Sequence, residues 1–140
     1  MKKAGLLAGL PLLFLMGCGK GTVPEIEGYE WVMSTVQNLA DGQVLACSEE
    51  QSVGFEEAEQ VELICTAEDG ALTLADRTND QIYTGTYQLS EKDSEGVVYK
   101  IAVGGYEGLG ITAMTEYLGD SEDPTLVMNL EGYVMYFLAG

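Results

Sequence analysis

Residues 61–75 read Val61-Glu62-Leu63-Ile64-Cys65-Thr66-Ala67-Glu68-Asp69-Gly70-Ala71-Leu72-Thr73-Leu74-Ala75 and decide the fold. Two stretches of alternating apolar and polar residues flank Asp69-Gly70. Such alternation is typical of β-strands with one buried face. Because glycine accepts the positive φ that a tight hairpin turn needs, Asp-Gly between two such stretches predicts a β-hairpin. We therefore expect an all-β domain.

The same pattern recurs along the chain every 10 residues or so, which is typical of an antiparallel sandwich or barrel. Gly85 predicts a bend or bulge, and the glycines between residues 104 and 110 predict a turn before the next strand. The last stretch is apolar on both faces, which predicts a central strand or one that closes a barrel. The further expected strands cover residues 82–89, 97–103, 111–117, 125–130 and 133–138.

Residues 29–40 fit two periodicities. A helical stripe would contain Tyr29, Val32, Met33, Val36, Leu39 and Ala40, whereas an alternating strand would contain Tyr29, Trp31, Met33 and Thr35. The β-branched residues in this segment and the strand-rich remainder of the chain favour the strand.

The pattern as a whole resembles a lipocalin-like, or calycin-type, β-barrel. The likeness rests on Trp31 in the first strand, on about eight hairpin-linked strands and on the Gly85-Thr86-Tyr87 stretch midway. Lipocalins carry Gly-x-Trp in their first strand, where this chain has Gly28-Tyr29-Glu30-Trp31. The resemblance covers most of residues 28–140 and implies a single small antiparallel up-and-down barrel of about eight strands.

The first residues have the parts of an export signal. Lys2 and Lys3 precede an apolar run from Ala4 to Met16, and small Gly17 precedes Cys18. The run is shorter than the roughly 20 apolar residues that a membrane-spanning helix needs. Leu15-Met16-Gly17-Cys18 resembles the lipobox of bacterial lipoproteins, which implies cleavage after residue 17 and a diacylglycerol thioether on Cys18. The alternative is an ordinary secretory signal with an incidental cysteine.

A lipid on Cys18, with further acylation such as palmitate, would hold the protein on a cell membrane facing outside the cytoplasm. We expect residues 1–17 to be the lipoprotein signal peptide, residues 18–27 to be the lipidated cysteine and a short tether, and residues 28–140 to be the barrel domain. In this arrangement the chain resembles small Firmicutes-type lipoproteins that carry such domains, a likeness that implies no activity.

The charge excludes some partners. All 23 acidic residues follow Cys18, and the only cations there are Lys20, Arg77, Lys92 and Lys100. Nucleic acid is not an expected partner, because its binding depends on clustered Lys and Arg. The same charge repels anionic membrane surfaces, while the spread of the acids along the chain also fits a simple role in solubility.

Cys47 and Cys65 leave two alternatives open. Outside the cytoplasm they could form a disulfide, or they could be two small buried apolar side chains.

The composition argues against catalysis. The chain has no histidine, which removes the usual general base of Ser and Cys hydrolases and the commonest transition-metal ligand. We therefore expect no enzyme activity, no cofactor and no metal. The oxygen-rich turns at residues 76–80 and 120–123 lack EF-hand spacing and are interpreted as solvated turns rather than calcium sites.

Two functions remain. The first is a non-catalytic binding module for a small apolar or aromatic ligand, and the second is a structural or interaction protein of the cell envelope whose barrel core is filled. A cavity above about 300 Å³ would favour the ligand, and an exposed apolar patch would favour a protein partner. The candidate ligand-lining residues are Trp31, Tyr83, Tyr87, Tyr99 and Met135.

Overall fold

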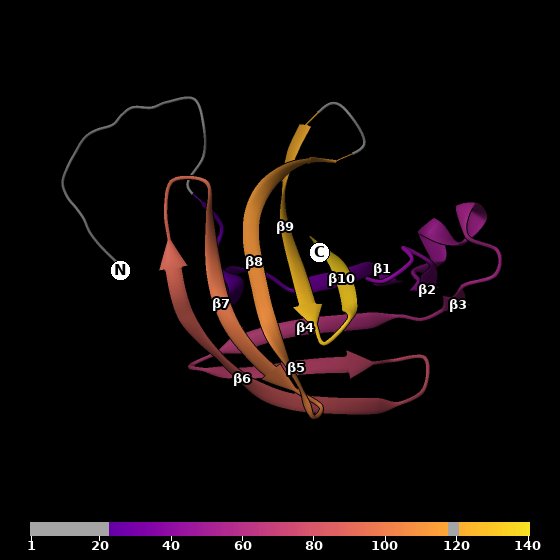
Figure 1. The fold of residues 1–140 in the computed structure, drawn as a ribbon, viewed down its shortest axis with the longest axis horizontal. Helices are drawn as coiled ribbons and strands as arrows, with labels where there is room; N and C mark the ends of the chain where they lie inside the picture. The colour runs from indigo at the N-terminus through magenta and orange to yellow at the C-terminus, as the bar shows by residue number, and fades with distance from the viewer. Residues whose placement is uncertain (1–22, 118–120) are drawn as a thin grey trace.

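A computed structural model describes residues 23–117 and 121–140. They form a closed antiparallel β-barrel of eight strands, as predicted. Each strand pairs with the next along the barrel, and β10 pairs back with β1 to close it (Figure 1). The barrel strands are β1 (Trp31–Asn38), β4 (Leu63–Glu68), β5 (Ala71–Asp76), β6 (Gln81–Lys92), β7 (Gly96–Val103), β8 (Tyr106–Tyr117), β9 (Ser121–Leu130) and β10 (Tyr133–Ala139).

The hairpin that decided the fold is confirmed as β4 and β5. Glu68 pairs with Ala71 across the turn, and Asp69 and Gly70 both have positive φ, at 51° and 83°. This is the backbone geometry that two-residue hairpin turns require. The strand interpretation of residues 29–40 is also confirmed, because β1 runs through this segment with a bulge between Met33 and Thr35.

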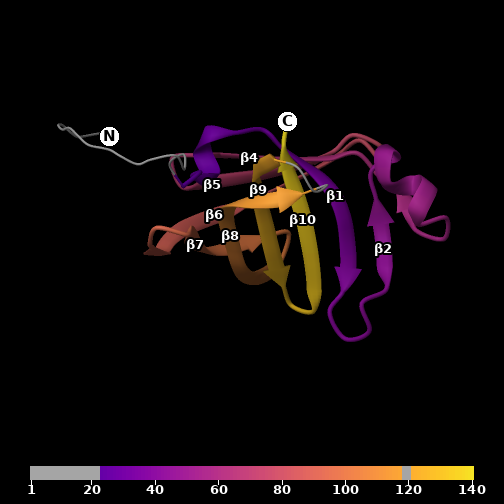
Figure 2. The ribbon, with the colours of Figure 1, turned by 90° about the horizontal axis from the view of Figure 1, so that it is seen from above.

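A short insertion lies beside the barrel. It comprises β2 (Val44–Cys47), the 3-10 helix η3 (Glu49–Gly54) and β3 (Glu59–Gln60), for which the sequence pattern predicted no element. The first part of β1 pairs with β4, whereas its second part pairs with β2. Figure 2 shows β2 and η3 outside the barrel, next to β1.

The glycines of β6 and β8 have structural roles that differ from the predicted bend and turn. β8 runs without a break through Gly108 and Gly110, which face the barrel interior, so the predicted turn is restricted to Gly104-Gly105. A Cβ at Gly108 would overlap the backbone carbonyl of Asn129 on β9. The pairing of β6 is regular at Gly85, and its bulge lies between Leu89 and Glu91. These interior glycines therefore allow close approach of neighbouring strands.

One end of the barrel is closed by residues 23–28, which we call the plug. Ile26, in the 3-10 helix η2 (Ile26–Gly28), is fully buried against the core. Its N–H donates to the Tyr99 hydroxyl at 3.1 Å, and the Trp31 indole N–H donates to its carbonyl at 2.8 Å. The Thr112 hydroxyl donates to the Pro24 carbonyl at 2.7 Å.

The plug corrects the expected tether. The glycines and the proline of residues 18–27 predict a tether, but the buried side chain of Ile26 and its hydrogen bonds place residues 23–27 in the folded domain. The predicted signal peptide, residues 1–17, and Cys18 lie outside the described residues. Among the described residues no helix is long and apolar enough to cross a membrane.

The cysteines are unbonded. Cys47 and Cys65 are both fully buried free thiols, which corresponds to the second of the two alternatives and not to a disulfide. Cys65 pairs with Trp31 on β1, and Cys47 pairs with Thr35 four positions further along the same strand. This offset corresponds to about 13 Å, whereas a disulfide needs Cα atoms within about 7 Å.

Candidate functional site

The end of the barrel opposite the plug is open and contains a cavity of about 490 Å³, which we call the mouth cavity. The strand register explains its lining, because inward-facing residues of adjacent strands stand side by side there: Val36 opposite Met135, and Val103 opposite Tyr106. Every one of the eight strands contributes a side chain. The aliphatic and thioether side chains are Val36, Leu63, Leu74, Val103, Leu130 and Met135.

Three tyrosines form the rim of the mouth cavity. Tyr106 and Tyr133 are the first residues of β8 and β10, Tyr83 is the third residue of β6, and each of the three is 40–47% exposed. The rings of Tyr106 and Tyr133 meet edge to face, with centroids 6.1 Å apart. The Tyr83 hydroxyl donates to Gln81 Oε1 at 2.5 Å. Because the rim is half exposed, the cavity is open to solvent.

The middle of the barrel, between the mouth cavity and the plug, is filled. Leu72, Leu126, Met128 and Phe137 are fully buried and pack into one core with the plug residue Ile26. A ligand could therefore occupy the open end but not the full length of the barrel.

The five predicted ligand-lining residues are divided between the two ends. Tyr83 and Met135 line the mouth cavity. Trp31 and Tyr99 are buried at the closed end, where both hydrogen-bond to Ile26. The hydroxyl of Tyr87 hydrogen-bonds to the carboxylate of Glu27 in the plug. Trp31, Tyr87 and Tyr99 therefore hold the plug and do not reach the mouth cavity.

The closed end changes the titration of its phenols. Burial, together with the hydrogen bond to Glu27, raises the pKa of Tyr87 to about 12. Burial also raises the pKa of Tyr99, although its hydrogen bond from Ile26 acts in the opposite direction. Both hydroxyls therefore stay neutral at physiological pH and serve as hydrogen-bonding groups.

Sequence reasoning missed Tyr106 and Tyr133. Both follow a turn with positive-φ glycine, Gly104-Gly105 and Glu131-Gly132 respectively. Tyr106 lies within the predicted glycine turn, and Tyr133 lies in the predicted final strand, whose residues on both faces are apolar. The signal that could have found them is a tyrosine within the first three residues after each of three hairpin turns at one end of an up-and-down barrel.

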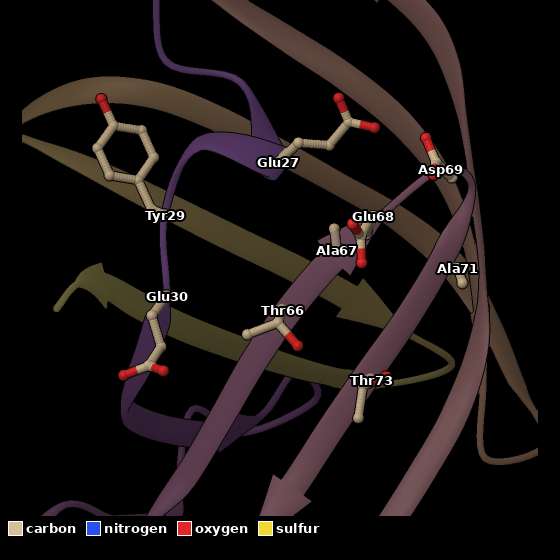
Figure 3. A pocket seen from close by; sticks show the side chains of 9 residues that line it. All are labelled: Glu27, Tyr29, Glu30, Thr66, Ala67, Glu68, Asp69, Ala71 and Thr73. Atoms are coloured by element: carbon tan, nitrogen blue, oxygen red, sulfur yellow. The ribbon is translucent and has the colours of Figure 1, made fainter.

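A second hollow, of about 510 Å³, lies on the outside of the barrel. Figure 3 shows it between the segment of Glu27, Tyr29 and Glu30 and the hairpin turn that carries Glu68 and Asp69. Four carboxylates surround it. Among the described residues, however, no group of three or more acidic or cysteine side chains is close enough to hold a metal ion.

In the turn at residues 76–80, a side-chain carboxylate accepts hydrogen bonds from the backbone of the same turn. Asp76 Oδ1 accepts hydrogen bonds from the N–H groups of Thr78 and Asn79 at 3.0 and 2.9 Å. This is the side-chain-to-backbone pattern of an Asx turn. Residues 118–120, and with them Asp120 of the second oxygen-rich turn, lie outside the described residues.

The outer face of the barrel carries an apolar row across four strands. In register, Val98 of β7 pairs with Ile111, Ile111 with Val127, and Val127 with Tyr136 of β10. All four alternate with inward-facing residues, so they point away from the core. Ile111 and Tyr136 are 43% and 37% exposed, and Leu109 beside them is 45% exposed.

No family model, curated protein or solved structure matches the chain. The up-and-down barrel is compatible with a lipocalin-like fold.

Proposed function

We propose that the protein is a non-catalytic binding module that takes a small apolar or aromatic molecule into the mouth cavity. One observation carries the proposal: a cavity of about 490 Å³, open to solvent, is lined by aliphatic, thioether and tyrosine side chains that together come from all eight strands. Small-molecule sites span about 300–1,000 Å³ and are mostly apolar with a few polar groups. The phenol groups of the rim would supply those polar groups.

We also propose that the protein is a lipoprotein anchored through Cys18 and exposed outside the cytoplasm. The lipobox-like residues 15–18 support this proposal. Metabolic labelling with a palmitate analogue should mark the wild-type protein, and Cys18→Ala should remain unlabelled. Equal labelling of both proteins, or no labelling of the wild-type protein, would argue against the anchor.

The anchor and the plug would orient the barrel. Five residue steps separate Cys18 from Val23 at the closed end, a distance of at most about 18 Å. The plug and the mouth cavity lie at opposite ends of the barrel. An anchored protein would therefore have its closed end near the membrane and its mouth facing the aqueous phase, from which the ligand would enter.

Binding can be tested with N-phenylnaphthylamine, an uncharged dye that fluoresces in apolar sites. The chain beginning at Gly19 retains the plug and every barrel strand, so it is a suitable protein for titration. Tyr83→Ala removes part of the rim and should weaken binding about tenfold. Ile82→Ala is the matched control, because Ile82 is 70% exposed on the opposite face of β6.

Two results would count against the binding module. One is no saturable dye binding by the wild-type chain, and the other is an equal loss of binding in the Tyr83 and Ile82 variants. Circular dichroism and unfolding curves of all three proteins establish that each variant is folded.

The second candidate function is an envelope interaction protein, which the outer apolar row favours. Exposed apolar residues at Leu109, Ile111 and Tyr136 are the kind of surface that another protein covers. Crosslinking in intact cells should capture a partner with the wild-type protein and lose it with Ile111→Lys. Val53→Lys is the control, because Val53 is 85% exposed in η3, away from this row. Equal capture by both variants would exclude this surface.

A further inference from the structure

We infer that the mouth cavity selects uncharged or cationic apolar molecules and rejects anionic amphiphiles such as carboxylate or sulfonate compounds. This inference rests on the proposed binding function and names the ligand class of the same site. It follows from the charges around the open end of the barrel.

Carboxylates flank the rim tyrosines. Glu107 follows Tyr106, and Glu131 lies between Leu130 and Tyr133, which both line the cavity. The start of β8 is joined to the β9–β10 turn at this end, because the backbone N–H of Glu107 donates to Glu131 Oε2 at 2.8 Å. The turn between β5 and β6 adds Asp76 and Asp80 at the same end.

Nearby cations do not balance the negative charges at the open end of the barrel. The three cations within the described residues are Arg77, Lys92 and Lys100. Arg77, at the mouth, is 3.4 Å from the carboxylate of Glu62. Lys92 is 2.6 Å from Glu25 at the closed end, and Lys100 is exposed on the outer face of β7.

An anionic ligand would therefore approach several like charges without gaining a partner. Charges about 10 Å away still act in dilute salt, where the Debye length is longer than this separation. A neutral molecule pays no such penalty, and a cationic one gains from both the carboxylates and the faces of the tyrosine rings.

Two dyes with the same aromatic skeleton test the inference. N-phenylnaphthylamine is uncharged, and anilinonaphthalene sulfonate carries one negative charge. In 10 mM salt the wild-type chain should bind the neutral dye at least tenfold more tightly. The ratio should fall severalfold in 500 mM salt, because screening weakens the repulsion.

A pair of charge-reversal variants separates repulsion from the intrinsic hydration of the sulfonate. Glu107→Lys should tighten binding of the anionic dye severalfold and leave the neutral dye unchanged. Glu95→Lys is the matched control, because Glu95 lies in the β6–β7 turn at the closed end. It makes the same change in net charge at a greater distance, so it should tighten binding of the anionic dye much less than Glu107→Lys does.

The outcomes distinguish the inference from the proposed function. If neither dye binds, the binding function itself fails. If the neutral dye binds but the ratio is independent of salt and of Glu107→Lys, the cavity binds ligands and the carboxylates do not select them. Tighter binding of the anionic dye by the wild-type chain would overturn the inference directly.

Discussion

The indole N–H of Trp31 donates a hydrogen bond of 2.8 Å to the carbonyl oxygen of Ile26, and both residues are fully buried. This contact joins the first strand to the plug at one end of the barrel, whereas the opposite end is open. The two ends of the barrel therefore have different physical roles, since one holds the fold together and the other contains the cavity.

Ile26→Ala should lower the free energy of unfolding by about 2–4 kcal/mol, because it leaves a cavity at a fully buried position. Dye binding at the distant mouth should be unchanged under conditions in which the variant is folded. Urea unfolding and dye titration measure the two effects, with Val53→Ala as the exposed control. A large loss of dye affinity in folded Ile26→Ala would contradict the separation of the two ends.

The chain beginning at Gly19 should contain two free thiols when it is purified without reductant. Cys47 and Cys65 are unbonded, and their register on β1 keeps them apart. A chromogenic thiol reagent should count both thiols after denaturation and react slowly with the native protein, because both side chains are buried. A count near zero after denaturation would show a disulfide.

Alkaline pH should destabilise the fold through Cys65. Burial raises the pKa of this thiol from its ordinary value of 9.0 to about 12. The folded state therefore binds the proton more tightly than the unfolded state, so the associated stability is complete below pH 9 and is lost as the pH rises toward 12.

The cost of ionising Cys65 should be about 1 kcal/mol between pH 9 and pH 10. Urea unfolding at these pH values should show a steeper decline for the wild-type chain than for Cys65→Ala, whatever the variant's stability at pH 8. Parallel declines would mean that Cys65 is not responsible.

Gly108→Ala should destabilise the barrel by about 1–3 kcal/mol or more, because the added Cβ would overlap the carbonyl oxygen of Asn129. Gly54→Ala is the control, since a Cβ at Gly54 meets no atom within 4 Å. Thermal unfolding compares the two variants. Equal stability would contradict the close approach of β8 and β9 at this position.

The sequence predicted the barrel because its signals are local. Alternation and the Asp69-Gly70 turn specify the β4–β5 hairpin without reference to the rest of the chain. The plug escaped prediction because Ile26 is its main apolar contact and its hydrogen-bond partners are distant in the chain. Tyr99 is 73 positions from Ile26, and Thr112 is 88 positions from Pro24.

The site was predicted only in part for a similar reason. An aromatic residue facing the interior can lie at either end of a barrel, and alternation gives its face but not its depth. Tyr83 and Met135 reach the mouth cavity, whereas Trp31 and Tyr99 lie at the closed end. The position of a residue along the barrel axis depends on the register of all eight strands. That register is set by all of the turns in combination, and no single turn determines it.

Native mass spectrometry tests the central claim most directly. The chain should be exported with a cleavable signal that leaves Gly19 as its first residue, and then measured from the cell extract before and after denaturation. We expect a mass excess in the native state that disappears on denaturation and belongs to an uncharged or cationic small molecule. A native mass equal to that of the bare chain, together with no saturable binding of N-phenylnaphthylamine, would contradict a ligand in the mouth cavity.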